Sequence, residues 1–167
     1  NAGDDRLDAG AGADAALGGQ GDDVVEGGSC SDWHLNGNRG IDLVLGGGGD
    51  DRLFGGPDGD WLDGGDGADT LSGDRGNDVL VGAGGADVFD LLTEGGFDRI
   101  EDFSAADGDR IRLPAGINGS GIATAADALA RLAADEGGSR LDLGEGHGLV
   151  LAGIAPAALD AAAFWIV

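Results

Sequence analysis

The sequence lacks lysine and methionine and contains a single cysteine, Cys30, among 167 residues. One cysteine excludes a disulfide within the chain. No apolar run approaches the ~20 residues that a membrane-spanning helix needs, so we expect no membrane insertion. Because the chain has no Met and begins at Asn1 inside a repeating unit, we expect it to be part of a longer protein whose upstream domain is a natural partner.

Catalytic motifs are also missing. The sequence contains no H-E-x-x-H, no G-x-S-x-G, and no Cys–His pair with an orienting carboxylate. Cys30 and His34 are too few ligands for zinc, and the alternative is an irregular repeat with a buried thiol and a stray imidazole. His147 lies in a glycine-rich turn without an obvious partner, so we interpret it as a loop residue. We predict that this chain is not an enzyme and that any catalysis belongs upstream.

Positive charge is scarce. The chain has nine arginines and 32 acidic residues, which gives a net charge of −23, and 27 of the acidic residues are Asp. This balance disfavours nucleic acid and acidic membranes as partners and favours cations. Short Asp side chains suit tight turns and the coordination of hard cations better than Glu does.

Aspartate recurs every nine residues through the first half of the chain. The surrounding frame is Gly-Gly-x-Gly-x-Asp followed by three residues with an apolar centre, as in residues 46–54 (GGGGDDRLF). One step, from Asp32 to Asp42, has ten residues. The ten positions are Asp5, Asp14, Asp23, Asp32, Asp42, Asp51, Asp60, Asp69, Asp78 and Asp87.

Each unit predicts a glycine turn followed by a three-residue strand. Glycine permits positive φ and close approach of backbones. Strands this short must stack and share a core. The predicted core residues stand two places after each Asp: Leu7, Ala16, Val25, His34, Val44, Leu53, Leu62, Leu71, Leu80 and Phe89.

Two units are expected to complete one turn of a flattened right-handed coil, so alternate aspartates form two ladders. The first ladder contains Asp5, Asp23, Asp42, Asp60 and Asp78, and the second contains Asp14, Asp32, Asp51, Asp69 and Asp87. Carboxylates on strands ~4.8 Å apart repel by roughly 3 kcal/mol per pair at an effective dielectric constant near 20. The stack therefore requires cations between its rungs.

These units resemble the G-G-x-G-x-D-x-U-x repeats of the RTX (repeats-in-toxin) family. The resemblance implies a parallel β-roll with about eight Ca²⁺ ions between turns, held by the ten aspartates and by backbone carbonyls. The implied carbonyls are those of Gly19, Gly21, Gly28, Gly47, Gly49, Gly56, Gly65, Gly67, Gly76 and Gly85. Six to eight oxygen ligands are what Ca²⁺ prefers.

Some units depart from the frame. Cys30 and Asp58 replace the glycine at the fourth turn position, and Asn38, Asp74 and Ala83 replace the second. One residue is inserted near Asn36. Sites that include Asp32 are therefore the least regular. A disordered acidic segment is the alternative to the roll, but disorder does not require an apolar residue after each Asp.

Residues 91–167 change character, so we divide the chain into a roll at 1–90 and a C-terminal cap. Residues 97–103 and 107–113 alternate like half-buried strands. Asp98 and Asp102, together with Asp107 and Asp109, either close one more calcium site or face solvent. A capping box at Thr124 predicts a helix over 124–135, and residues 139–151 predict a hairpin. The expected fold class is all-β, a roll followed by antiparallel strands and one short helix.

The chain ends in Asp160-Ala-Ala-Ala-Phe-Trp-Ile-Val, which resembles the uncleaved C-terminal signal of type I secretion substrates. This resemblance implies a bacterial type I exporter as partner and a secreted or cell-surface location. Two alternatives remain. The first is a calcium-dependent S-layer or adhesin module. The second is a carbohydrate-contacting module of a secreted polysaccharide-acting enzyme, for which Trp33 and Trp61 are candidate contacts.

Overall fold

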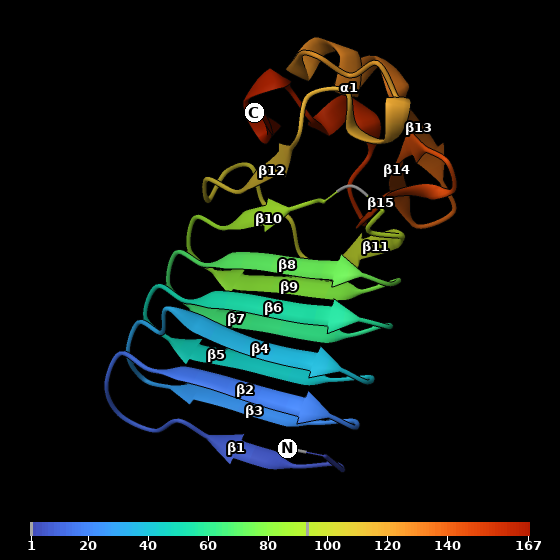
Figure 1. The fold of residues 1–167 in the computed structure, drawn as a ribbon. Helices are drawn as coiled ribbons and strands as arrows, with labels where there is room; N and C mark the ends of the chain where they lie inside the picture. Colours follow the sequence, from blue (N-terminus) through green and yellow to red (C-terminus); the bar gives the residue numbers. More distant parts are fainter. Residues whose placement is uncertain (1, 93) are drawn as a thin grey trace.

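Two stacked β-sheets form the molecule, as seen in a computed structural model that describes residues 2–92 and 94–167. The nine-stranded sheet has the order β1-β3-β5-β7-β9-β11-β15-β14-β13, and the seven-stranded sheet has the order β16-β12-β10-β8-β6-β4-β2. From β1 to β12, strands of odd number lie in the nine-stranded sheet and strands of even number in the seven-stranded sheet (Figure 1). The predicted fold class, a parallel β-roll with a C-terminal cap, is confirmed.

The roll consists of ten strands that pair in parallel with the strand two places along the chain. They are β1 (Arg6–Asp8), β2 (Ala15–Gln20), β3 (Val24–Gly28), β4 (His34–Arg39), β5 (Leu43–Gly48), β6 (Arg52–Pro57), β7 (Trp61–Asp66), β8 (Thr70–Arg75), β9 (Val79–Gly84) and β10 (Val88–Asp90). Most contain six residues, twice the predicted length. The pairing continues into the glycine turn, where Gly65 lies opposite Ala83.

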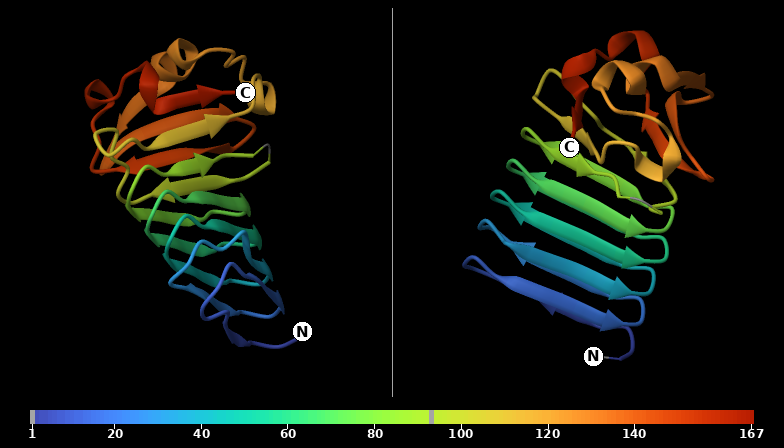
Figure 2. Two further views of the ribbon diagram at one scale, coloured as in Figure 1. Left: turned by 90° about the vertical axis from the view of Figure 1, so that its left-hand side faces the viewer. Right: turned by 45° about the horizontal axis from the view of Figure 1, so that its top comes forward.

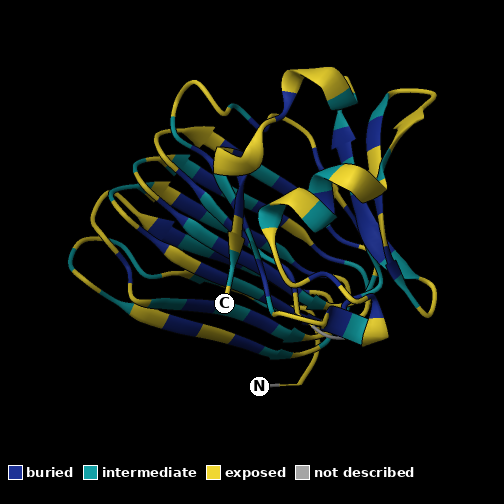
Figure 3. Cartoon of the chain, turned by 90° about the horizontal axis from the view of Figure 1, so that it is seen from above, coloured by how far each residue is buried: buried dark blue, intermediate teal, exposed yellow. Residues whose placement is uncertain are grey.

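A single column of apolar side chains fills the space between the sheets. Each rung contributes one residue, and Val25, Val44, Leu53, Leu62, Leu71, Leu80 and Phe89 are completely buried. Buried and exposed residues alternate along the strands when the stack is viewed from its capped end (Figure 3). This alternation follows from the two-residue period of a strand, which places every second side chain inside.

The prediction that His34 occupies the core is wrong. Leu35 is completely buried and lies in register with Ala16 and Leu53, whereas His34 is half-buried on the outer face beside Phe54. The extra residue therefore lies between Asp32 and Leu35, and not near Asn36. A strand that shifts by one residue reverses its faces, and the apolar leucine gains more from burial than the imidazole does.

Both sheets continue beyond residue 90. Strand β11 (Phe97–Ile100) extends the nine-stranded sheet, and β12 (Arg110–Leu113) extends the other, where β16 (Phe164–Ile166) completes it. Ile100 and Ile111 continue the buried column. The division at residue 90 stays a prediction, since the pairing of strands does not stop there.

The cap contains a three-stranded antiparallel unit of β13 (Leu132–Asp135), β14 (Gly138–Gly144) and β15 (His147–Ala152). The predicted hairpin is confirmed by β14 and β15. Helix α1 (Ala125–Arg131) begins at the predicted capping box of Thr124 and Asp127. It ends four residues earlier than predicted, because residues 132–135 pair with β14 instead.

The cap lies at one end of the stack and the N-terminus at the other (Figure 2). Three short 3₁₀ helices, at Ile117–Gly119, Pro156–Ala158 and Ala161–Ala163, join its strands. No helix within the described residues is long and apolar enough to cross a membrane.

Candidate metal centre

Aspartate side chains form two hydrogen-bonded ladders along the turns that precede the strands. In each ladder the backbone N–H of one Asp donates to Oδ1 of the Asp on the next rung, over 2.7 to 3.2 Å. The odd ladder contains Asp5, Asp23, Asp42, Asp60, Asp78 and Asp98. The even ladder contains Asp14, Asp32, Asp51, Asp69, Asp87 and Asp109. The predicted division of the ten repeat aspartates into two ladders is confirmed.

The second oxygen of these carboxylates is buried without a hydrogen-bond donor among the described residues. This holds for Oδ2 of Asp5, Asp14, Asp23, Asp32, Asp42, Asp51, Asp60, Asp69 and Asp78. Burying a carboxylate oxygen without a partner is costly, because water is removed and nothing replaces it. Nine such oxygens at the same position of successive turns require either protons or cations.

In the ladder aspartates from Asp42 onward, burial raises the pKa of the carboxyl group above its ordinary value of 3.8. The pKa rises to about 6 for Asp51 and about 7 for Asp60 and Asp69. Burial is the main cause; the backbone hydrogen bond opposes it, and neighbouring aspartates raise the pKa further. Burial likewise raises the pKa of Asp78 and of Asp98. These carboxyl groups thus keep their protons to a higher pH than an ordinary Asp does, and a divalent cation would compete for the same oxygens.

Backbone carbonyls approach the unpartnered oxygens at the first turn position. A Cβ atom added to Gly18 would meet Asp23 Oδ2 at 2.5 Å and the carbonyl oxygen of Gly37, on the next rung, also at 2.5 Å. The sequence interpretation missed these first-position glycines. Their regular spacing five residues before each ladder Asp is a signal that could have identified them: Gly18, Gly27, Gly37, Gly46, Gly55, Gly64, Gly73 and Gly82.

The glycine carbonyls expected from the sequence lie at the second and fourth turn positions. Those of Gly28 and Gly47 point along the stack into the next turn on the same side, as do those of Gly49, Gly67 and Gly76. Left-handed φ values at these positions, such as 101° at Gly47, allow this orientation. Calcium coordination by these carbonyls remains a prediction.

Residues that replace the turn glycines keep the same backbone shape. Asn38, Asp58, Asp74 and Ala83 all have positive φ, between 61° and 82°. The turn that contains Cys30 also keeps its ladder contact, because Asp14 N–H donates to Asp32 Oδ1 at 2.8 Å. Cys30 is exposed, so the interpretation of a buried thiol is wrong.

Beyond residue 90, Asp98 and Asp109 are buried members of the ladders, and the alternative that they face solvent is wrong. Asp109 was only a secondary candidate in the sequence. Asp102 is exposed and lies outside both ladders, where it accepts hydrogen bonds from the N–H groups of Gly82 and Ala83. Asp107 is exposed as well.

The donor set fits Ca²⁺ better than a softer metal. Within residues 2–92 and 94–167, no cluster of three His, Cys, Asp or Glu side chains that could hold a metal ion is present, so a metal site here must also draw on backbone oxygens. The ladders instead offer two carboxylates per interval, with backbone carbonyls nearby. Ca²⁺ accepts such all-oxygen sites with six to eight ligands in flexible geometry.

Comparison with known proteins points to the same chemistry. The family model described as "RTX calcium-binding nonapeptide repeat (4 copies)" matches residues 1–32, 34–62, 54–89 and 63–100, which is more than half of the chain. A search of curated proteins found no match. One similar solved structure is the AlgE6R3 subunit of the Azotobacter vinelandii mannuronan C5-epimerase. The identity is 22% and the TM-score 0.45, over 98% of this chain and 78% of that chain.

Proposed function

Because the chain belongs to the family of RTX calcium-binding nonapeptide repeats, we propose that it is a calcium-triggered folding module of a larger secreted protein. The observation that carries this proposal is the series of nine buried Oδ2 atoms without donors. When bound, Ca²⁺ would supply the positive charge that compensates these carboxylate oxygens. The aspartates would hold the ion, and the turn carbonyls would complete its coordination.

We take each interval between successive ladder carboxylates as one candidate calcium site. About eight intervals separate the ten repeat aspartates, and Asp98 and Asp109 add one interval at the end of each ladder. Each ladder of six carboxylates thus has five intervals. A carboxylate committed to Ca²⁺ stays ionised and suits neither general acid nor general base work, which supports a non-catalytic role for this chain.

Calcium-dependent folding is compatible with export of the chain in an unfolded state. In a cytosol with little free Ca²⁺, the net charge of −23 opposes compaction, and an unfolded chain can pass through a type I exporter. Outside, Ca²⁺ binds the folded state alone and therefore supplies folding free energy. The C-terminal segment suits both tasks, since β16 pairs with β12 and buries Phe164 once folded.

A Ca²⁺ titration followed by far-UV circular dichroism and light scattering tests this proposal. We expect a steep gain of β structure at ~10⁻⁴ to 10⁻³ M Ca²⁺, the affinity range of extracellular calcium modules, with the particle remaining monomeric. EDTA should reverse it. A fold that forms equally well in EDTA would refute the proposal.

Two alternatives draw on the outer face of the nine-stranded sheet. Leu43, Trp61 and Val79 lie side by side there, and Trp61 is 45% exposed. A row of this kind suits self-assembly at a cell surface, in which case calcium would produce growing particles. It also suits stacking on a sugar ring. Glycan binding that Trp61→Ala abolishes would favour the carbohydrate-contacting module.

A further inference from the structure

A hydrogen bond recurs along the turns and extends to the last one. In five turns the N–H at the fourth position donates to the carbonyl at the third position of the next turn on the same side. Gly67, for example, donates to Gly84 O at 2.7 Å, and Gly76 donates to Gly95 O at 2.7 Å. This contact fixes the spacing of successive turns and hence of the aspartates that follow them.

Residues 94–98 form the last turn of the odd ladder. Gly96 has the fourth-position geometry, with φ of 97° and a Cβ site that the carbonyl of Gly76 would block. Two residues later, Asp98 Oδ1 accepts the N–H of Asp78 at 3.2 Å. Among the described residues no further glycine turn of the repeat follows on this side, so no third-position carbonyl accepts the N–H of Gly96.

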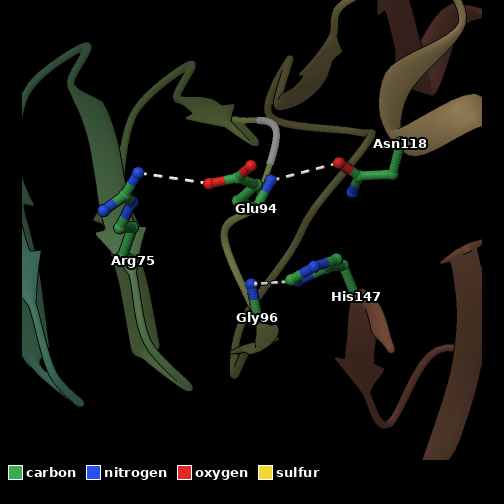
Figure 4. A network of polar contacts seen from close by, with 5 residues as sticks. All are labelled: Arg75, Glu94, Gly96, Asn118 and His147. Atoms are coloured by element: carbon green, nitrogen blue, oxygen red, sulfur yellow. Dashed lines mark hydrogen bonds and ion pairs between the residues drawn. The ribbon is translucent and has the colours of Figure 1, made fainter. Parts of the chain in front are cut away.

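A histidine of the cap takes the place of that carbonyl. The N–H of Gly96 donates to His147 Nδ1 at 2.9 Å (Figure 4). The N–H of the next residue, Gly148, donates to Gly96 O at 2.8 Å. His147 is half-buried at the start of β15. A ring nitrogen that accepts a hydrogen bond is unprotonated, so the proton of this imidazole is on Nε2. The interpretation of His147 as a loop residue without a partner is wrong.

We propose that His147 is a positioning residue for the terminal calcium site, between Asp78 and Asp98. Its Nδ1 replaces the carbonyl of the next turn and holds residues 94–98 at the spacing that the other turns maintain among themselves. This inference rests on the proposed calcium function. Asp98 is the last carboxylate of the odd ladder. An interior aspartate is held in position by the rungs on both sides, whereas Asp98 has a rung on one side and the cap on the other.

The other side-chain contacts to this turn serve different positions. The N–H of Phe97 donates to Asn77 Oδ1 at 2.8 Å. Asn118 Oδ1 accepts the N–H of Glu94 at 3.1 Å (Figure 4). The ion pair between Arg75 and Glu94 spans 3.1 Å, but its side chains are 72% and 67% exposed. Exposed pairs contribute little to stability. Arg75 is therefore a matched control, since it contacts the same turn without occupying the carbonyl's place.

The test compares His147→Ala, His147→Asn and Arg75→Ala in saturating Ca²⁺. Calorimetry counts the bound ions, and amide exchange followed by NMR reports on Gly96, Asp78 and the interior Asp42. We expect His147→Ala to lose one bound ion and to speed exchange at Gly96 and Asp78 at least tenfold, with Asp42 unchanged. His147→Asn should restore both properties, because its Oδ1 takes the place of Nδ1. Arg75→Ala should match the wild type.

Unchanged ion number and exchange in His147→Ala, with a wild type that binds Ca²⁺ normally, would overturn this inference alone. A wild type that binds no Ca²⁺ would overturn the proposed function as well. If His147→Ala does not fold, His147→Asn and His147→Gln decide the matter. The acceptor of Gln reaches the Nε2 position instead, so equal ion numbers in these two variants would contradict a role for Nδ1.

Discussion

Replacing Asp60 by Asn should change the stability of the roll in opposite directions with and without calcium. Asp60 is 3% exposed in the middle of the odd ladder. Its Oδ1 accepts the N–H of Asp42 at 2.8 Å, and its own N–H donates to Asp78 Oδ1 at 2.8 Å. Asn keeps an acceptor for the first bond and leaves the second untouched. The substitution therefore removes the charge while the ladder's hydrogen bonds remain.

In calcium the expected effect is a large loss. A site with a Kd of ~10⁻⁴ M, held at ~10 mM Ca²⁺, contributes about 2.7 kcal/mol to folding. Asp60 borders two intervals, so the loss of both sites lowers the free energy of unfolding by about 5 kcal/mol. The urea midpoint, measured by circular dichroism, should fall accordingly.

In EDTA at pH 8 the same substitution should favour folding. Burial raises the pKa of Asp60 to about 7, so its buried Oδ2 is charged and unpartnered at that pH. A neutral amide relieves a cost on the order of 1–3 kcal/mol, that of an unsatisfied buried group. Folding induced by trimethylamine N-oxide, an excluded osmolyte, should need less osmolyte in the variant than in the wild type.

Asp66→Asn is the matched control, because Asp66 is exposed at the end of the same strand, β7. It removes the same charge outside the ladder and should shift neither midpoint by more than about 0.5 kcal/mol. Equal effects of the two substitutions in calcium would refute the reasoning, as would a loss of stability by Asp60→Asn in EDTA.

Three further outcomes are expected. Without calcium, burial raises the pKa of carboxyl groups such as that of Asp60 from 3.8 to about 7, so the folded state binds protons more tightly than the unfolded state. The β structure measured in EDTA should therefore increase as the pH is lowered from 8 to 4, and it should be lost as the pH rises through 6 to 7. Gly18→Ala should abolish calcium-induced folding, because its Cβ would meet Asp23 Oδ2 at 2.5 Å, whereas Gly137→Ala, with nothing within 4 Å, should fold normally. Leu35→Ala should lower the free energy of unfolding in calcium by about 2–5 kcal/mol, and His34→Ala by less than about 1, as measured by urea unfolding.

The nine-residue period allowed the ladders to be predicted because it fixes both the face and the rung of each side chain. A residue that recurs with the period of a stack must occupy the same place in every turn, whatever the details of packing. The same argument explains why Asp98 and Asp109 were less certain. Their units lack the full glycine frame, and the structure shows that they continue the ladders by the pairing of β11 and β12 with the roll and by the hydrogen bonds from Asp78 and Asp87.

The inserted residue shows where periodicity stops being informative. Between Asp32 and Asp42 the sequence contains one residue too many, and either His34 or Leu35 can be assigned to the core. Leu35 occupies the core because burying its apolar side chain is more favourable than burying an imidazole. The spacing of the repeats does not contain this information. The alternation of faces then places His34 outside, and Trp33 is exposed in the bend before β4, where the two rings stack at a centroid distance of 5.9 Å.

The cap was the least predictable part, because its structure depends on partners distant in sequence. Residues 132–135 read Leu-Ala-Ala-Asp, a good helical continuation, yet pairing with β14 outweighs that propensity. His147 is a stronger case, since its partner Gly96 is 51 residues away. A side chain that replaces a backbone carbonyl leaves no repeat, spacing or composition to detect. It becomes visible only once the last turn is known to lack the acceptor that the earlier turns obtain from their neighbours.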